Sequence, residues 1–250
     1  MLVADLLVGQ RGCEALVEQV ANMLERELSE CGTFHFFKDH AKLPADADCT
    51  ALGLLALLRC GRPVWERAMR ALDTILANVD ANNVVETYLD PTGERSGIVD
   101  AVVCVNVLRL AHALNRWHEA SSTWAHVCRV LTQRSFINGT RYYNSPDTFL
   151  FLLTRLLGEL PHGTDLPWHE MRGILAERIG QTMHPLDLAQ RLLTARWLGM
   201  ENSADALALQ AQLAPDGSAA SDGLFCYGRS RVFFGSPALT AAFALASVGP

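Results

Sequence analysis

The chain has 250 residues, half of them hydrophobic and 19% charged, so it has enough apolar side chains to bury a large core. Its 21 Lys and Arg residues against 27 Asp and Glu give a net charge of −6, which leaves no basic stripe for nucleic acid and excludes that class of partner. Seven cysteines without close pairing indicate a reducing compartment and not a disulfide framework.

Amphipathic segments form the first group of predicted helices. The first segment, residues 13–30, places Leu16 and Met23 in an apolar stripe and Glu14 and Glu18 on the remaining surface. The same pattern, in places weaker, recurs in residues 64–79, 121–133, 168–180 and 203–213. We expect each of these helices to bury one face and to expose the other.

A second group of segments is apolar almost all round. These segments are residues 50–58, 98–114, 149–157, 186–198 and 238–246. A helix without a polar face is normally buried on every side. The helices start near residues 48, 98, 145, 186 and 236, a period of roughly 40–50 residues that is typical of repeated helical pairs. Ser145-Pro146 and Ser236-Pro237 place Ser at the N-cap and Pro at the first helical position.

The alternation of these two kinds of helix predicts an all-α fold. We expect one domain over residues 1–250, a single α/α toroid of about five to six helical hairpins around an apolar central cavity. A stacked solenoid is the alternative, but fully apolar inner helices favour a closed ring. We find no convincing strand alternation in the sequence.

Aromatic residues are concentrated in the loops before the predicted inner helices. In a closed ring the inner helices all run in one direction, so these loops meet at one mouth. The loop residues are Phe34, Phe36, Phe37, Tyr88, Phe136, Tyr142, Tyr143, Phe225, Tyr227, Phe233 and Phe234. We therefore expect an aromatic entrance to the cavity.

The first inner helix begins with Asp46-Ala47-Asp48-Cys49-Thr50. Two carboxylates at a helix N-terminus can simply cap exposed amides. Next to an apolar chamber, however, one of two close carboxyls is expected to keep its proton, because burial disfavours the charged form. The helix N-terminus favours the anion, so a proton-donating role requires that burial and pairing dominate.

This segment, extended to Ala51 and followed by an apolar run, resembles the Asp-x-Asp-Asp motif of class II terpene cyclases, the superfamily of squalene-hopene and oxidosqualene cyclases. In that family the middle aspartate protonates an alkene or an epoxide and starts a carbocation cascade. The resemblance makes Asp48 the general acid and Asp46 and Cys49 its hydrogen-bonding neighbours, and it implies no metal and no cofactor. The departure from the bacterial pattern is Cys49, where a third carboxylate is usual.

The length of the chain indicates which members of this superfamily it resembles most. Ordinary class II cyclases have two helical domains, whereas 250 residues suffice for one, so the chain is most similar to monodomain cyclases of meroterpenoids. That family implies a linear isoprenoid or a prenylated aromatic substrate with an alkene or a terminal epoxide to protonate.

A carbocation cascade needs a dry chamber with aromatic faces. The candidate substrate-binding residues are Phe37, Asp100, Asn106, Tyr142, Tyr143, Phe149, Trp197, Phe233 and Phe234. Asp100 and Asn106 interrupt an apolar helix, and one of them either orients the acid, ends the cascade or is tied to the backbone. His184 and Tyr142 are candidate terminal bases. Core packing is the alternative role for each aromatic residue.

Three other functions compete with this interpretation. A zinc-dependent prenyltransferase would need ligands such as Asp48, Cys49 and His40, or Asp222 and Cys226, but their spacing is unspecific. An inverting glycosidase needs a polar groove, whereas the inner helices here are apolar. A toroid that binds a hydrophobic ligand without catalysis stays open, since the third acidic position of the motif is missing.

Location and partners follow from the same patterns. Residues 2–8 are apolar but short and contain Asp5, so we predict no signal peptide, and charges interrupt the longest apolar runs before they could span a bilayer. We expect a cytoplasmic protein whose partner is a small hydrophobic isoprenoid. Peripheral contact with a membrane stays open.

Overall fold

A computed structural model describes residues 1–160, 167–228, 230 and 232–248. The chain divides into two compact units, Met1–Val127 and Cys128–Pro250, and each unit is described by itself. The prediction of one domain over residues 1–250 around a central cavity therefore stays a prediction. Within the described residues, no helix has both the length and the apolar character needed to cross a membrane.

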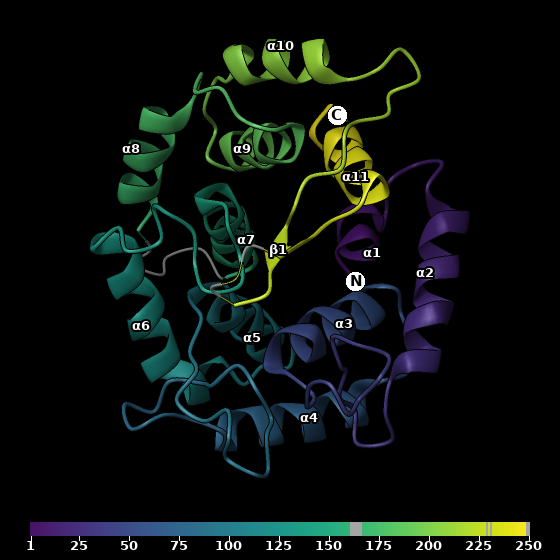
Figure 1. The fold of residues 1–250 in the computed structure, drawn as a ribbon, viewed down its shortest axis with the longest axis vertical. Helices are drawn as coiled ribbons and strands as arrows, with labels where there is room; N and C mark the ends of the chain where they lie inside the picture. The colour runs from purple at the N-terminus through teal and green to yellow at the C-terminus, as the bar shows by residue number, and fades with distance from the viewer. Residues whose placement is uncertain (161–166, 229, 231, 249–250) are drawn as a thin grey trace. The chain divides into compact units, whose positions relative to one another are not determined.

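The first unit is built around two apolar helices, α3 (Ala47–Arg59) and α5 (Ala101–Ala113), which pack against each other (Figure 1). Helix α3 also contacts α1 (Leu2–Leu7), α2 (Glu14–Glu27) and α4 (Trp65–Ala77). The 3₁₀ turn η1 (Trp117–Ala120) follows α5, and α6 (Ser121–Thr132) runs from this unit into the second. As predicted, α3 and α5 are buried along most of their length.

The second unit is built around α9 (Pro185–Trp197). This helix contacts α7 (Pro146–Glu159), α8 (Trp168–Arg178), α10 (Ser203–Gln212) and α11 (Pro237–Val248). Figure 1 shows α10 on the outer side of α9, between α8 and the chain that leads to α11. The alternation of inner and outer helices predicted from the sequence is thus present in this unit.

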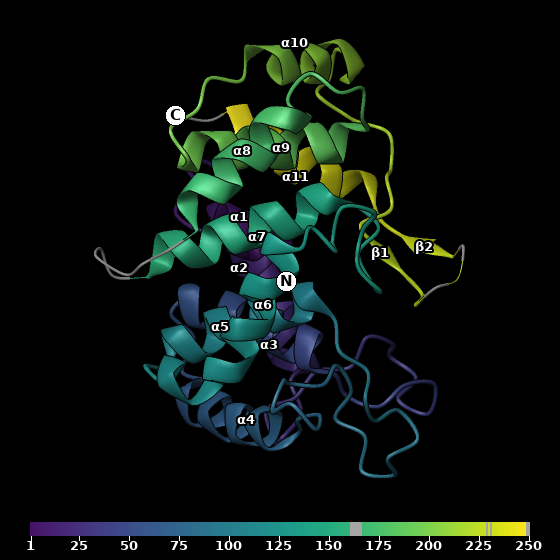
Figure 2. The same cartoon turned by 90° about the vertical axis from the view of Figure 1, so that its left-hand side faces the viewer.

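Strands β1 (Phe225–Cys226) and β2 (Phe233–Phe234) pair in antiparallel fashion, Phe225 opposite Phe234. The two strands form a hairpin that extends beyond the ends of the neighbouring helices (Figure 2). The expectation of no strand was wrong here, because a two-residue strand is too short to show an alternating pattern. The pair does not change the predicted all-α class, since the other regular elements of the described residues are helices.

Both Ser-Pro starts cap helices as predicted. The Ser145 hydroxyl accepts a hydrogen bond from the backbone N–H of Asp147 at 3.2 Å, and Pro146 opens α7. The Ser236 hydroxyl likewise accepts from the N–H of Leu239 at 3.1 Å, directly before Pro237. Each cap satisfies one of the amides that a helix N-terminus leaves without a partner.

Helix α1 is held in the first unit by the buried charge of Asp5, an interaction that was not predicted from the sequence. Asp5 is only 2% exposed, and its carboxylate lies 2.9 Å from Nη1 of Arg59 and 3.2 Å from Nη2 of Arg109. Arg109 is itself fully buried in α5. A buried charge needs opposite charge and hydrogen bonds around it, so α1, α3 and α5 depend on one another.

Candidate functional site

Asp46 is the N-cap of α3. Its Oδ1 accepts a hydrogen bond from the backbone N–H of Cys49 at 2.6 Å, and the side chain is 5% exposed. Burial raises the pKa of Asp46 from its usual 3.8 to about 6, although hydrogen bonds from the amide and the thiol of Cys49 act in the opposite direction. The capping role considered from the sequence is therefore present, together with a carboxyl that is readily protonated.

Asp48 lies in the first turn of the same helix and is 8% exposed. Its Oδ1 accepts a hydrogen bond from Nδ2 of Asn106 in α5 at 2.8 Å, and Asn106 is fully buried. The contact exists because α3 and α5 pack side by side. Among the residues expected to orient the acid, Asn106 is the one that the structure brings to Asp48.

Cys49 is half-buried and directly follows Asp48 in the sequence. Burial raises the pKa of its thiol well above the usual value, and the neighbouring Asp46 and Asp48 carboxyls raise it further. The thiol therefore stays neutral and can donate a hydrogen bond to Asp46, as expected of a neighbour of the acid.

Asp147 in the second unit occupies the same place in its helix as Asp48, two residues after the N-cap. It is fully buried, and Arg178 holds both of its oxygens, Nε to Oδ1 at 2.6 Å and Nη2 to Oδ2 at 2.7 Å. A bidentate Arg brings a positive charge to both oxygens of the carboxyl group, whereas an amide donor such as Asn106 carries no charge. The aspartate in the first turn of α3 therefore has a neutral partner, and the one in the first turn of α7 has a charged partner.

The loops before α3 and α5 are hydrogen-bonded to each other at the residues next to Asp46 and Asp48. Ala47 N–H donates to the carbonyl of Thr87 at 2.8 Å, and Leu89 N–H donates to that of Ala45 at 2.9 Å. Tyr88 between them is 7% exposed, with the guanidinium of Arg95 5.1 Å from its ring. Within the first unit, the loop convergence predicted from the sequence is present.

Phe34 and Phe37 precede α3. Phe34 is 1% exposed, and its backbone N–H donates to the hydroxyl of Thr50 in α3 at 3.0 Å. Phe37 is half-buried and lines a pocket of about 250 Å³ together with Phe34 and Phe36. Phe34 thus supports the helix that carries Asp48, and Phe37 lines the neighbouring pocket.

The aromatic candidates of the second unit differ in exposure. Tyr143 is fully buried against Phe225 at 5.0 Å between ring centres, and Phe149 is fully buried against Phe136 at 4.5 Å. Of the remaining candidates, Tyr142 and Phe234 are half-buried and Phe233 is 53% exposed. Cys226 N–H donates to the carbonyl of Tyr142 at 2.8 Å, which joins the loop before α7 to β1.

Trp197 does not lie with the other aromatic candidates for substrate binding, although this was predicted from the sequence. It ends α9, at the opposite end from the loops before the inner helices, and it is 53% exposed with its ring against Gly158. The prediction used the apolar pattern of this segment and did not consider that Trp197 stands at the C-terminal end of the helix. Trp197 therefore does not belong to the aromatic group at the helix N-termini.

Asp100 and His184 are both N-caps. Asp100 is 3% exposed and accepts from the backbone N–H groups of Val102 at 2.8 Å and Val103 at 3.3 Å, which matches the backbone-tied alternative. His184 is exposed at the start of α9.

The residues considered for zinc have other contacts. The thiol of Cys226 bonds to the carbonyl of Arg141 at 3.2 Å, and the ring of His40 stacks on His35 at 3.8 Å. In the part of the chain that the structure describes, no three His, Cys, Asp or Glu side chains converge as a metal site would require.

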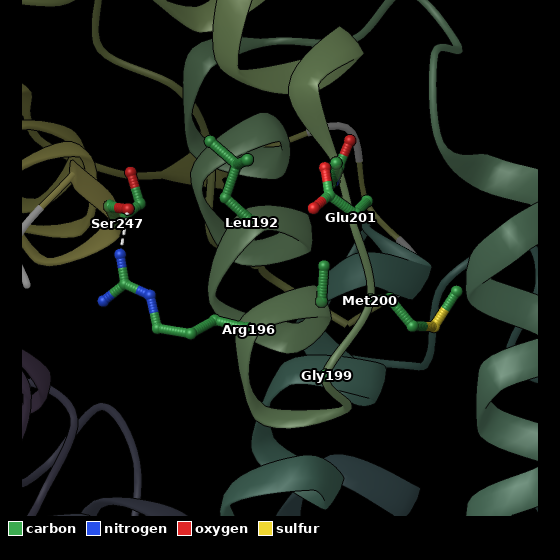
Figure 3. Close-up of a pocket in the computed structure, with 8 residues that line it drawn as sticks. Leu192, Arg196, Gly199, Met200, Glu201 and Ser247 are labelled. Carbon is green, nitrogen blue, oxygen red and sulfur yellow. Dashed lines mark hydrogen bonds between the residues drawn. The ribbon is translucent and has the colours of Figure 1, made fainter.

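A polar pocket of about 350 Å³ opens beside the C-terminal end of α9 (Figure 3). Arg196 reaches from α9 to the end of α11 and donates to the carbonyls of Ala246, at 3.2 Å, and Ser247. Because its guanidinium satisfies backbone carbonyls there, we assign Arg196 to holding the two helix ends together.

Asp187 and Gln190 lie in the buried face of α9 toward α7 and were not predicted as site residues from the sequence. The signal was available, because both are polar residues inside an otherwise apolar segment, as Asn106 is in α5.

Residues 9–114, which include Asp46, Asp48, Cys49 and Asn106, match the family described as sesquiterpene cyclase astC-like C-terminal domain. The chain is also 30% identical over 226 residues, 86% of its length, to drimenol cyclase drtB of Aspergillus calidoustus. It spans 41% of the length of that relative.

Solved structures share the fold at low sequence identity. The type II terpene cyclase MstE from Scytonema superposes with a TM-score of 0.72 at 17% identity, over 98% of this chain and 84% of MstE. A protein from Actinoplanes gives a TM-score of 0.75 at 19% identity, over 98% and 86% of the two chains. A variant of MstE has been solved with geranylgeranyl dihydroxybenzoate, its substrate. These matches confirm the predicted fold class.

Proposed function

We propose that the chain catalyses a protonation-initiated cyclisation of an isoprenoid, with Asp48 as the general acid. Its sequence similarity to a drimenol cyclase and its fold similarity to the type II terpene cyclase MstE support this proposal. The hydrogen bond from Asn106 to Asp48 is the observation that carries the proposal. By holding Oδ1, the amide orients the carboxyl that is to deliver the proton.

The first step follows from this geometry. The π electrons of a terminal alkene, or a lone pair of a terminal epoxide oxygen, take the proton from the Asp48 carboxyl group. The resulting carbocation is attacked by the next double bond, so each ring closes by forming one C–C bond and moving the charge along the chain. Asp46 and the neutral thiol of Cys49 surround the carboxylate that remains.

The substrate class rests on the relatives. Geranylgeranyl dihydroxybenzoate in MstE supports a prenylated aromatic substrate, and the drimenol cyclase relative supports a linear isoprenoid. Aromatic faces stabilise a moving positive charge without trapping it, and Phe37, Tyr142 and Phe234 are half-buried candidates. We also propose a cytoplasmic protein that takes up so apolar a substrate by transient contact with a membrane surface.

The decisive experiment compares wild type with Asp48→Asn. Purified protein is incubated with linear isoprenoids, prenylated aromatic acids and their terminal epoxides, both with and without EDTA. We expect cyclised product from wild type and a loss of about 10²–10⁴-fold in the variant, the usual contribution of a general acid. Tight binding without turnover in wild type would support a carrier of hydrophobic ligands instead, and activity abolished by EDTA would indicate a metal enzyme.

Asn106→Leu tests the contact that carries the proposal. Removing a hydrogen bond to a catalytic carboxyl should lower kcat by about 10–100-fold. KM should change little, because Asn106 contacts the acid. Cys104→Ala is the matched control, since Cys104 is a buried residue of the same helix and bonds weakly to Val85. If Asn106→Leu kept full kcat, Asn106 would have no part in orienting the acid.

A further inference from the structure

The hairpin of β1 and β2 carries three exposed apolar side chains at its outer end. Tyr227 is 42% exposed, Val232 54% and Phe233 53%. They stand next to one another, because the N–H of Tyr227 donates to the carbonyl of Val232 at 2.9 Å across the turn, and Phe233 follows directly. Exposed apolar side chains that form a group mark a surface for contact with another molecule.

The base of the hairpin is fixed to the rest of the second unit. Cys226 N–H donates to the carbonyl of Tyr142 at 2.8 Å, and the ring of Phe225 packs against the fully buried Tyr143. The exposed side chains therefore belong to an ordered element, which extends beyond the ends of the neighbouring helices (Figure 2).

The sequence around this hairpin is basic, although the whole chain has a net charge of −6. Residues 223–250 contain no Asp, Glu or Lys, and their charged side chains are Arg229 and Arg231, which lie outside the described residues. Arg141 lies at the base of the hairpin, where its backbone carbonyl accepts a hydrogen bond from the thiol in β1 at 3.2 Å. The nearest acid before the hairpin in the sequence is Asp222. Aromatic and aliphatic side chains beside arginines are complementary to a membrane surface that contains anionic lipids.

The size of the exposed group favours a membrane over a protein partner. A stable interface between two proteins buries about 800 Å² on each side. Three half-exposed side chains offer on the order of 250 Å², since a fully buried aromatic side chain accounts for about 150–250 Å². Transient binding to a membrane requires less area, because apolar contact and attraction of basic residues to lipid phosphates add up.

The hairpin also adjoins candidate substrate-binding residues of the same unit. Phe234 is the last residue of β2, and Tyr142 in the loop before α7 is bonded to β1. Both side chains are half-buried. A membrane in contact with the hairpin would therefore bring a dissolved isoprenoid next to them.

We propose that the hairpin of β1 and β2 is the surface with which the protein binds membranes that contain anionic lipids. Tyr227, Val232 and Phe233 enter the boundary between headgroups and acyl chains, and the positive charge of the region attracts the lipid phosphates. The inference rests on the proposed function, in which an isoprenoid is taken up from a membrane, and it names the contact surface.

Val232→Glu tests this surface by sedimentation with vesicles of phosphatidylcholine, with and without phosphatidylserine. We expect wild type to bind the vesicles that contain phosphatidylserine, and less so as the salt concentration rises. The variant should bind at least about tenfold more weakly, because it loses apolar contact and adds a charge that the anionic surface repels. Leu207→Glu is the matched control, since it adds the same charge at a side chain that is 68% exposed in α10, and it should bind as wild type does.

Hydrogen exchange of the wild-type protein gives a measurement that depends on no variant. Vesicles with phosphatidylserine should slow the exchange of backbone amides in β1 and β2 and leave α10 unchanged. Unchanged exchange in the hairpin, or equal binding of Val232→Glu and wild type, would overturn the inference. So would a wild-type dimer that Val232→Glu dissociates, because the hairpin would then contact a second copy of the chain.

The outcomes separate this inference from the cyclase proposal. Cyclisation is measured with substrate dissolved in detergent, and vesicle binding is measured without substrate. Product in detergent without binding to vesicles overturns the membrane surface alone. Binding through the hairpin without any product overturns the cyclase alone.

Discussion

Buried carboxyl groups in this protein differ in the partner that each one meets. Asp5, Asp147 and Asp205 contact arginines, which place an opposite charge beside each of them. Asp46 and Asp187 meet neutral donors and have a raised pKa. Proton transfer requires groups of the second kind, because they change charge near neutral pH.

The sequence was sufficient to single out Asp46, Asp48 and Asn106, since each is polar at the start of an apolar segment or inside one. The arginine partners could not be predicted in the same way. Asp147 meets Arg178 from another helix, and Asp5 meets Arg109 across 104 positions of sequence. Such pairs depend on how helices pack, and one sequence without relatives does not contain that information.

The raised pKa of Asp46 predicts a dependence of stability on pH. The folded protein holds this proton with a pKa of about 6, against the usual 3.8 in the unfolded chain. The folded state therefore binds more protons between these values, and the contribution is full below pH 3.8 and lost as the pH rises through 6. Between pH 4 and pH 7 the free energy of unfolding should fall by about 2–3 kcal/mol more in wild type than in Asp46→Asn.

Urea unfolding at several pH values measures this difference. Asn is as good an N-cap as Asp, so the variant removes the titration and keeps the cap. Other titrating groups, Asp187 among them, are common to both proteins and cancel in the comparison. Equal pH profiles would show that Asp46 is not protonated in the folded state near pH 5.

At the level of elements, hydrophobic periodicity predicted the long helices well. The amphipathic segment predicted over 64–79 is α4, and the apolar segment predicted over 186–198 is α9, with ends that differ by at most two residues. Both long helices span enough turns for their pattern to be counted. Helix α1 was not predicted as a helix, because six residues are too few for such a count.

The predicted buried face of α2 was partly wrong. Leu16 and Met23 were placed in its apolar stripe, yet they are 45% and 48% exposed, while Ala21 and Leu24 are buried. The apolar stripe predicted from the sequence is wider than the face of α2 that the neighbouring helices cover. Periodicity identifies an amphipathic helix more reliably than it identifies which of its apolar residues are covered.

Gly53 in α3 predicts a large effect for a small substitution. A Cβ atom at this position would lie 2.5 Å from the ring of Phe34, which is 1% exposed and cannot easily move. Gly53→Ala should therefore destabilise the protein by about 1–3 kcal/mol despite the better helix propensity of Ala. Gly173 in α8 is the control, since nothing lies within 4 Å of a Cβ there.

Gly173→Ala should stabilise the protein by about 0.5–1 kcal/mol. Chemical denaturation of both variants and of wild type measures these changes in the free energy of unfolding. Two substitutions of the same sign would contradict the packing of Phe34 against α3.

At the level of the whole molecule, the repeat of helical pairs was enough to predict the fold class. The division into units Met1–Val127 and Cys128–Pro250 was not predicted, because it reflects which residues contact each other at long range. A period in the sequence identifies the repeating element but says little about how strongly successive copies are joined.

The seven free cysteines give a test over the whole chain. Cys31 is exposed, and hydrogen bonds from the Ser29 and Thr33 hydroxyls lower the pKa of its thiol. All the other cysteines are buried or half-buried. A thiol reagent should therefore modify one group rapidly in the folded protein, and Cys31→Ser should remove that rapid phase.

The unfolded chain should react at all seven positions, because the cysteines are free. The chromophore that the thiol reagent releases is counted without and with denaturant. The first count gives the thiols that react in the folded protein, and the second gives those that react in the unfolded chain. Fewer than seven reactive thiols in denaturant without a reductant would contradict the free state of the cysteines.

The contact of Asp5 with Arg109 bears on the order in which the first unit folds. Arg109 cannot enter the interior favourably until an acid meets it, and that acid lies 104 positions earlier in the chain. Closing so long a loop is entropically unfavourable and slow compared with forming either helix. We therefore expect α3 and α5 to associate loosely at first, and the unit to become rigid only when the beginning of the chain returns to them.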